Sequence, residues 1–182
     1  MTLETEGLWV EWHVRRDREF DDIALWGGSV YAYDETAESE QRAVGHASIV
    51  VSLRGIFHER DALFEALDAN SGDLSVIAEE LGRHDDHELI RWSDGPGLGM
   101  VIVESVELEP AYRGRDLGVE IVRDALAVMS AATVVLYPAP IGSKSKRGEE
   151  RLQAYWSRHG FEPLGNGVYI ASNDDVLAAG DR

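Results

Sequence analysis

The alternation of apolar and polar residues is strand-like in the first third of the chain. Aromatic and β-branched residues cluster there between glycines and charged turn segments, a pattern typical of strands. It predicts strands over residues 8–15, 29–33 and 44–53. Between the first two, Asp17–Leu25 places Phe20, Ile23 and Ala24 on one helical face, which predicts a short helix.

A helical period replaces this alternation after residue 59 and predicts two helices, over residues 60–68 and 72–81. In the second helix, Ser71 is the expected N-cap and Gly82 the expected stop. Between them, apolar residues are spaced as one helical face, at Leu74, Ile77, Ala78 and Leu81. The next segment, RHDDHELIRWSDGPGLG, is rich in turn formers and predicts an exposed loop.

Strands and helices alternate in the second half. MVIVESVELEP predicts a strand ended by Pro110, and the apolar stripe from Leu117 to Met129 predicts an amphipathic helix. TVVLYP predicts a buried central strand, residues 149–159 a helix, and the strands 161–164 and 167–172 a hairpin about an Asn-Gly turn. The whole order predicts an α/β (α+β) fold, with a helical pair inserted between strands three and four.

Composition indicates one acidic domain. The chain has 182 residues, 44% of them hydrophobic, which is the usual size of a single domain with one core. Its 34 acidic and 17 basic residues give a net charge of −17, which repels nucleic acid phosphates and anionic lipids. We therefore expect no nucleic acid and no membrane partner. The charge either confers solubility alone or also attracts a cationic acceptor, and both interpretations stay open.

The absence of cysteine excludes disulfides, thiolate metal sites and a cysteine nucleophile. The first residues, MTLETEGLWV, lack the apolar region of a secretory signal, so we expect a cytoplasmic protein. His84, Asp85, Asp86 and His87 resemble metal ligands, but adjacent positions in a loop are more typical of solvated side chains. No metal site is expected.

The candidate chemistry is concentrated in ELEPAYRGRDLG, residues 107–118, where a strand, a proline and a loop precede a helix. The first turn of a helix has backbone N–H groups without internal partners and the positive end of the dipole, so it suits a diphosphate. Gly114 and Gly118 let the backbone approach such a ligand. Arg113 and Arg115 would neutralise part of its charge.

This loop, followed further along by YWSRHGF, resembles the cofactor loop and next helix of the GNAT superfamily of N-acetyltransferases. The likeness extends over residues 100–172, including the closing hairpin. It implies a single GNAT-like domain with a mixed, mostly antiparallel central sheet flanked by helices. Residues 1–99 would form the acceptor-side half, 100–172 the half that binds acetyl-CoA, and 173–182 a tail.

The resemblance implies that an acetyl group passes from acetyl-CoA, as co-substrate, to an amine of a small molecule or protein. The loop would hold the pyrophosphate with backbone N–H groups of six residues, Arg113, Gly114, Arg115, Asp116, Leu117 and Gly118. The strands of this family splay near Val106 and Leu108, whose N–H groups would polarise the thioester carbonyl. Glu104 is the expected base, with Glu107 the next candidate.

The sequence departs from the family pattern at Asp116, where the family usually has its central glycine. The carboxylate is either an ordinary acid at a helix N-terminus or a charge that repels phosphate. At about 4 Å from one phosphate charge, it would cost about 1 kcal/mol in water and about 4 kcal/mol at an effective dielectric constant of 20.

Two further departures concern the acid and the topology. Trp156 stands where members of the family often have a Tyr that acts as general acid near the coenzyme sulfur. Tyr155, one residue earlier, is therefore the candidate acid, and Trp156 is a candidate cofactor contact. Both also fit a core stripe, and Glu104 and Glu107 also fit solvated strand positions. The family usually places its helical pair after the first strand. A catalytically degenerate GNAT-fold binding or regulatory module therefore stays an alternative, and the acceptor, acyl chain and homodimer formation stay open.

Overall fold

A mixed sheet organises the protein. The computed structural model describes residues 8–16, 23–32, 42–52, 60–93, 99–140 and 145–179. Within these residues, seven strands lie in the order β1-β2-β3-β4-β5-β7-β6, and only the β4–β5 pair is parallel. The strands are β1 (Leu8–Arg16), β2 (Ile23–Ala32), β3 (Arg42–Ser52), β4 (Gly99–Leu108), β5 (Ala131–Leu136), β6 (Glu162–Gly165) and β7 (Val168–Ser172). The predicted fold class is confirmed.

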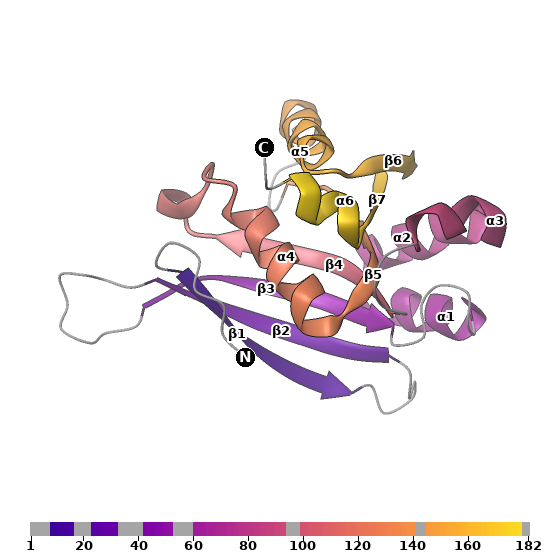
Figure 1. The fold of residues 1–182 in the computed structure, drawn as a ribbon, viewed down its shortest axis with the longest axis horizontal. Coiled ribbons are helices and arrows are strands. Elements are labelled where there is room, and N and C mark those ends of the chain that lie inside the picture. The colour runs from indigo at the N-terminus through magenta and orange to yellow at the C-terminus, as the bar shows by residue number, and fades with distance from the viewer. Residues whose placement is uncertain are drawn as a thin grey trace.

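Helices connect the strands and flank the sheet (Figure 1). Between β3 and β4 lie α1 (Arg60–Asn70), α2 (Gly72–Arg83), α3 (Asp86–Leu89) and the 3-10 helix η1 (Ile90–Trp92). The rest are η2 (Pro110–Tyr112), α4 (Leu117–Met129), α5 (Lys146–Arg158) and α6 (Asn173–Ala178). The predicted helical pair is therefore present between the third and fourth strands.

The first group of helices, α1, α2 and α3, packs on one face of the sheet. Leu67, Leu74 and Leu81 are buried there together with Ile102 and Ile170 from the strands. Leu74 and Leu81 lie two turns apart on one face of α2, and Leu67 comes from α1, so apolar faces of both helices meet the alternate apolar residues of the sheet. In Figure 1 this group gathers at the right-hand end of the sheet, so the other end of this face has no cover from it.

The other face of the sheet carries α4, α5 and α6. Val122 and Leu126 of α4 and Val176 of α6 are buried against Val101 and Val134 of the sheet. Every residue of β5 is buried, as a central strand covered on both faces requires. The sheet thus has a helix layer on each side, and α4 leads directly from the loop at its N-terminus across the strands (Figure 1).

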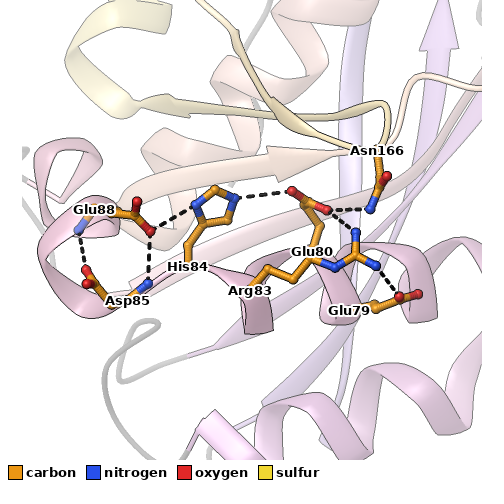
Figure 2. A network of polar contacts seen from close by, with 7 residues as sticks. All are labelled: Glu79, Glu80, Arg83, His84, Asp85, Glu88 and Asn166. Carbon is orange, nitrogen blue, oxygen red and sulfur yellow. Dashed lines mark hydrogen bonds and ion pairs between the residues drawn. The ribbon is translucent and has the colours of Figure 1, made fainter.

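A polar network joins the end of α2 to the β6–β7 hairpin (Figure 2). The Glu80 side chain is 6% exposed; it accepts hydrogen bonds from Asn166 Nδ2 at 2.6 Å and Arg83 Nη1 at 2.9 Å, and lies 3.2 Å from His84 Nε2. Asn166 and Gly167 form the hairpin turn with φ of 45° and 82°, as the predicted Asn-Gly turn requires. The hairpin is therefore confirmed, and a charged group holds it to α2.

The predicted helix at Asp17–Leu25 is wrong over its last residues. Ile23–Leu25 opens β2, which pairs with β1 on one side and β3 on the other, and these two ladders outweigh a weak helical period. Residues 17–22 lie outside the described residues. The second strand consequently begins at Ile23 and ends at Ala32, rather than covering residues 29–33.

The structure also differs from the predictions at the end of α2, in the segment that follows α2 and in the C-terminal segment. Helix α2 passes through Gly82 and ends at Arg83, with His84 N–H donating to the Leu81 carbonyl. The segment expected to be an exposed loop contains α3 and η1, and buries Leu89 and Trp92; its residues 94–98 lie outside the described residues. The segment 173–182, treated as a tail, begins with α6.

A capping box explains α3. Asp85 Oδ1 accepts from Glu88 N–H at 2.9 Å, and the Glu88 carboxylate accepts from Asp85 N–H at 3.1 Å (Figure 2). These reciprocal bonds satisfy two donors at the helix start, which stabilises even a single turn.

Among the described helices, none has the length and apolar composition needed to cross a bilayer.

Candidate active site

The parallel pair of strands opens at its carboxyl end. The last β4–β5 partners are Val103 and Leu136, where β5 ends. Strand β4 continues to Leu108, and its residues after Val103 pair only with β3. The expected opening beside Val106 and Leu108 is thus seen in the ladder.

The direction of the backbone groups along the opening follows from one hydrogen bond. Glu109, next after β4, donates its N–H to the Val44 carbonyl at 2.8 Å. Because successive residues of a strand direct their N–H and C=O groups to opposite sides, Val106 and Leu108 direct theirs away from β3 and into the opening. The Leu108 carbonyl indeed accepts from Arg113 Nε at 2.7 Å. The position proposed for the oxyanion donors is therefore geometrically consistent, and their role stays a prediction.

A β-bulge places Glu104 beside this opening. Ser48 pairs with Ser105 and Ile49 pairs with Val103, so Glu104 is an extra residue in β4. Its carboxylate accepts from Ser48 Oγ at 2.6 Å, which places it on the sheet face that Ser48 occupies. The side chain is half-buried.

An open pocket of about 350 Å³ contains the Glu104 side chain. Four adjacent strands, β1 to β4, line it with His13, Val14, Leu25, Trp26, Gly27, Ser48 and Glu104. Leu25 also contacts the core beneath α1–α3, so the pocket lies on the sheet face that carries this helical group. Glu107, the other candidate base, is exposed and pairs with His46 outside the pocket lining. The geometry favours Glu104.

The loop between β4 and α4 ends in a left-handed residue. Gly114 has φ of 76° and Asp116 has φ of 57°. The Asp116 carbonyl accepts from Val119 N–H at 3.1 Å and so starts the helix. Among the described residues, the N–H groups of Leu117 and Gly118 donate no hydrogen bond. These two donors at the positive end of α4 fit an anionic group.

The Asp116 carboxylate points to α5. Its Oδ1 lies 3.3 Å from His159 Nε2 and 3.5 Å from Arg158 Nη2, and it makes no capping bond to α4. Asp116 is thus the N-cap residue of α4 by position, with its carboxylate directed to two basic side chains of α5, and its effect on a bound phosphate stays a prediction. At the same loop, Arg113 and Arg115 are exposed. Their predicted contacts with phosphate stay predictions.

Tyr155 meets the first turn of α4. Its phenol oxygen accepts from Val119 N–H at 3.0 Å, and a Cβ on Gly118 would lie 3.3 Å from the same oxygen. Burial raises the pKa of Tyr155 to about 12, although the Val119 bond acts in the opposite direction. The phenol is therefore protonated at neutral pH, as a general acid must be. Its catalytic role stays a prediction.

Trp156 is directed into the core. It is 7% exposed and meets Phe161 edge to face, with ring centroids 5.1 Å apart. This burial favours the packing role over contact with a cofactor. Of the two aromatic residues, only Tyr155 lies at the first turn of α4.

The acidic and histidine cluster at residues 84–87 has local structural roles. His84 lies 3.2 Å from both Glu80 and Glu88, while Asp85 caps α3 (Figure 2). Within the described ranges, no group of three or more His, Cys, Asp or Glu side chains is arranged to hold a metal ion. The polar contacts of the cluster therefore belong to the end of α2 and the start of α3.

Sequence reasoning missed three residues that the structure brings to the site. Ser48 reaches Glu104 across a bulge, and His13 lines the same pocket from β1. His159, the last residue of the helix predicted over residues 149–159, contacts Asp116. No local pattern marks Ser48 or His13, because their positions depend on the register of four strands.

Several solved structures resemble this chain distantly. No family model and no curated protein matches it. An agmatine N-acetyltransferase structure is 12% identical with a TM-score of 0.47, covering 80% of this chain and 73% of that one. The polyamine N-acetyltransferase of Drosophila melanogaster is 13% identical, with a TM-score of 0.45 and coverage of 80% and 74%. AtaTR bound with acetyl-CoA is 10% identical, with a TM-score of 0.44 and coverage of 96% and 98%. At such scores, the function must be argued from the geometry of this chain.

Proposed function

We propose that this protein is an N-acetyltransferase that takes its acetyl group from acetyl-CoA. The observation that carries the proposal is the opening beside β4. One strand segment presents outward N–H groups from Val106 and Leu108, a carboxylate from Glu104 and, at its end, the loop to α4. A thioester needs an oxyanion donor, its amine acceptor needs a base, and a diphosphate needs a helix N-terminus.

The coenzyme would be held at the loop and the first turn of α4. Leu117 and Gly118 offer backbone N–H groups, and Arg113 and Arg115 add positive charge. Acetyl-CoA supplies the activated acetyl group as a thioester. The conformation of Gly114, with φ of 76°, suits a close approach of backbone to ligand.

Glu104 acts as the base. It accepts the proton that the amine loses as nitrogen bonds to the acetyl carbon, directly or through a water molecule. Ser48 donates to one carboxylate oxygen of Glu104 and thereby fixes its direction. The N–H groups of Val106 and Leu108 stabilise negative charge on the carbonyl oxygen. As the carbon–sulfur bond breaks, Tyr155 donates its proton to the sulfur.

The acceptor enters through the pocket of about 350 Å³ in which Glu104 lies. The pocket is on the sheet face that carries α1–α3, whereas α4 crosses the other face. Acceptor and coenzyme therefore approach Glu104 from opposite sides of the sheet. The carboxylate and the net charge of −17 favour a small molecule or protein amine that carries positive charge.

Release of coenzyme A in the presence of added amines tests the proposal. The chain contains no cysteine, so a thiol reagent detects the released coenzyme without background from the protein. Acetyl-CoA binding is first measured by calorimetry, and release is then measured with polyamines and lysine-containing peptides. Glu104→Gln should lower kcat/KM by about 10² to 10⁴ while leaving the Kd for acetyl-CoA unchanged. Tyr155→Phe should lower kcat through slower thiolate departure.

Two controls sharpen this experiment. Glu107→Gln removes the rival carboxylate on the same strand, and Glu150→Gln removes an exposed charge from α5. Both variants should retain activity within about twofold, because substitutions of exposed residues outside the site have small effects. Full activity of Glu104→Gln would refute the assigned base. Binding of acetyl-CoA without release for any amine would instead support the binding or regulatory module.

A further inference from the structure

The C-terminal end of α5 contacts the loop before α4, where Arg158 and His159 lie next to Asp116. This residue occupies the left-handed region with φ of 57°, where Asp is tolerated and Gly is preferred. Its Oδ1 lies within 3.3 Å of His159 Nε2 and 3.5 Å of Arg158 Nη2. The His159 side chain is only 12% exposed, so one partner of the carboxylate is held in place by packing.

A second contact lies three residues further along α4. The Tyr155 phenol accepts the Val119 N–H, while its ring meets His159 edge to face at 4.8 Å and lies under Arg158 at 5.6 Å. The groups that contact Asp116 thus also surround Tyr155. Helix α5 therefore holds the α4 start at two points, Asp116 and Val119.

The opposite end of the loop is fixed to the sheet. Arg113 Nε donates to the Leu108 carbonyl, at the end of β4. The loop residues between Arg113 and Asp116 consequently lie between one anchor on β4 and another on α5. The conformation at Gly114, with φ of 76°, is set within this span.

We propose that Asp116 is a positioning residue, whose carboxylate fixes the coenzyme loop to His159 and Arg158. The link to the coenzyme rests on the function proposed above. The effect on affinity is opposite in sign to simple repulsion of phosphate. Removing the carboxylate releases the loop and weakens coenzyme binding, because the N–H groups of Leu117 and Gly118 lose their fixed direction.

Hydrogen exchange of the protein without ligand tests the anchor itself. His159→Gln leaves the loop sequence unchanged, so faster exchange in residues 113–119 would report a lost contact and not a more flexible residue. Glu150→Gln, on the same helix, is the control and should exchange like the unaltered protein. Unchanged exchange in the loop of His159→Gln would overturn the inference.

Coenzyme binding tests the consequence. Asn and Gly both accept the left-handed conformation, but only Asn keeps an oxygen for His159 and Arg158. In about 1 M salt, where charges beyond about 3 Å are screened, Asp116→Gly should bind acetyl-CoA about two- to fivefold more weakly than Asp116→Asn. In turnover, Asp116→Gly should raise the KM for acetyl-CoA with kcat retained. Combining it with His159→Gln should add little further loss.

The outcomes separate this inference from the proposed function. If both Asp116 variants bind more tightly than the unaltered protein at low salt and equally at high salt, repulsion governs and the inference fails. If the unaltered protein does not bind acetyl-CoA, the proposed function fails and the coenzyme role of Asp116 falls with it. Faster loop exchange in His159→Gln would even then support the anchor between the loop and α5.

Discussion

Breaking the contact between Glu80 and the β6–β7 hairpin should destabilise the protein measurably. The Glu80 side chain is 6% exposed, and its Oε2 accepts from both Asn166 Nδ2 and Arg83 Nη1 (Figure 2). Glu80→Ala removes this acceptor. Asn166→Gly removes the amide donor and keeps the positive φ of the turn, since Gly adopts it freely.

The magnitude follows from the burial of each group. A hydrogen bond to a charged group contributes about 1.5–3 kcal/mol, and the bond between Glu80 and Asn166 is short at 2.6 Å. The Arg83 side chain is 50% exposed, so its ion pair adds at most about 1 kcal/mol. We expect Glu80→Ala to cost about 2–3 kcal/mol of unfolding free energy. The coupling between Glu80 and Asn166 should be about 1–2 kcal/mol, because Asn166 is exposed and regains water when the carboxylate is lost.

Urea unfolding followed by tryptophan fluorescence measures both quantities in a double-mutant cycle of the unaltered protein, Glu80→Ala, Asn166→Gly and the double variant. The denaturant slope should stay constant, since the unfolded chain exposes the same surface. A coupling energy below about 0.3 kcal/mol would contradict the reasoning, because that is the range in which independent sites add. It would mean that the hairpin is held to α2 by packing alone.

Two further predictions concern Asp124 of α4 and Gly45 of β3. Burial raises the pKa of Asp124 above its usual 3.8, although Trp12 Nε1 donates to it at 2.6 Å. The stability that protonated Asp124 contributes is therefore fully present below pH 3.8 and is lost as pH rises through the raised folded-state pKa. Asp124→Asn does not titrate, so the difference in unfolding free energy should shift in favour of this variant as pH rises above 3.8; a difference independent of pH would refute this. A Cβ on Gly45 would overlap the Glu107 carbonyl, so Gly45→Ala should lower the unfolding free energy by about 1–3 kcal/mol, and unchanged thermal unfolding would contradict it.

The order of elements could be predicted because each long element carries its own signal. The stripe ending at Leu81 and the Asn-Gly turn at residues 166–167 both lie in the structure where the pattern placed them. Helix α3 was missed because a four-residue helix has no hydrophobic period to detect. Its capping box, Asp85 followed by Glu88 three residues later, was nevertheless present in the sequence.

The pairing of strands overrode local propensity at Ile23. It begins a strand that pairs on one side with the preceding strand β1, where Arg16 faces Ala24, and on the other with β3, where Ser52, the partner of Ile23, lies much further along the chain. Non-local pairing is invisible to a helical or alternating period read within a short window. The first residues of β2 were therefore assigned to a helix.

The candidate site was predictable where a single segment builds it. The loop and the first turn of α4 could be read from residues 113–118, because a strand, a loop and a helix follow one another there. The direction of the Asp116 carboxylate could not, since His159 and Arg158 come from another helix. The hydrogen bond from Ser48 to Glu104 likewise depends on a bulge whose position only the β3–β4 register defines.

The bulge in β4 also affects how the strand tolerates deletions. Because Ser48 faces Ser105 and Ile49 faces Val103, Glu104 is the residue that the ladder does not require. Deletion of Glu104 would make the ladder regular and leave all the remaining side chains of β4 on their present faces. Deletion of a neighbour within a regular part of the strand would turn the following residues over. At this position evolution can therefore remove or insert the carboxylate without changing the fold.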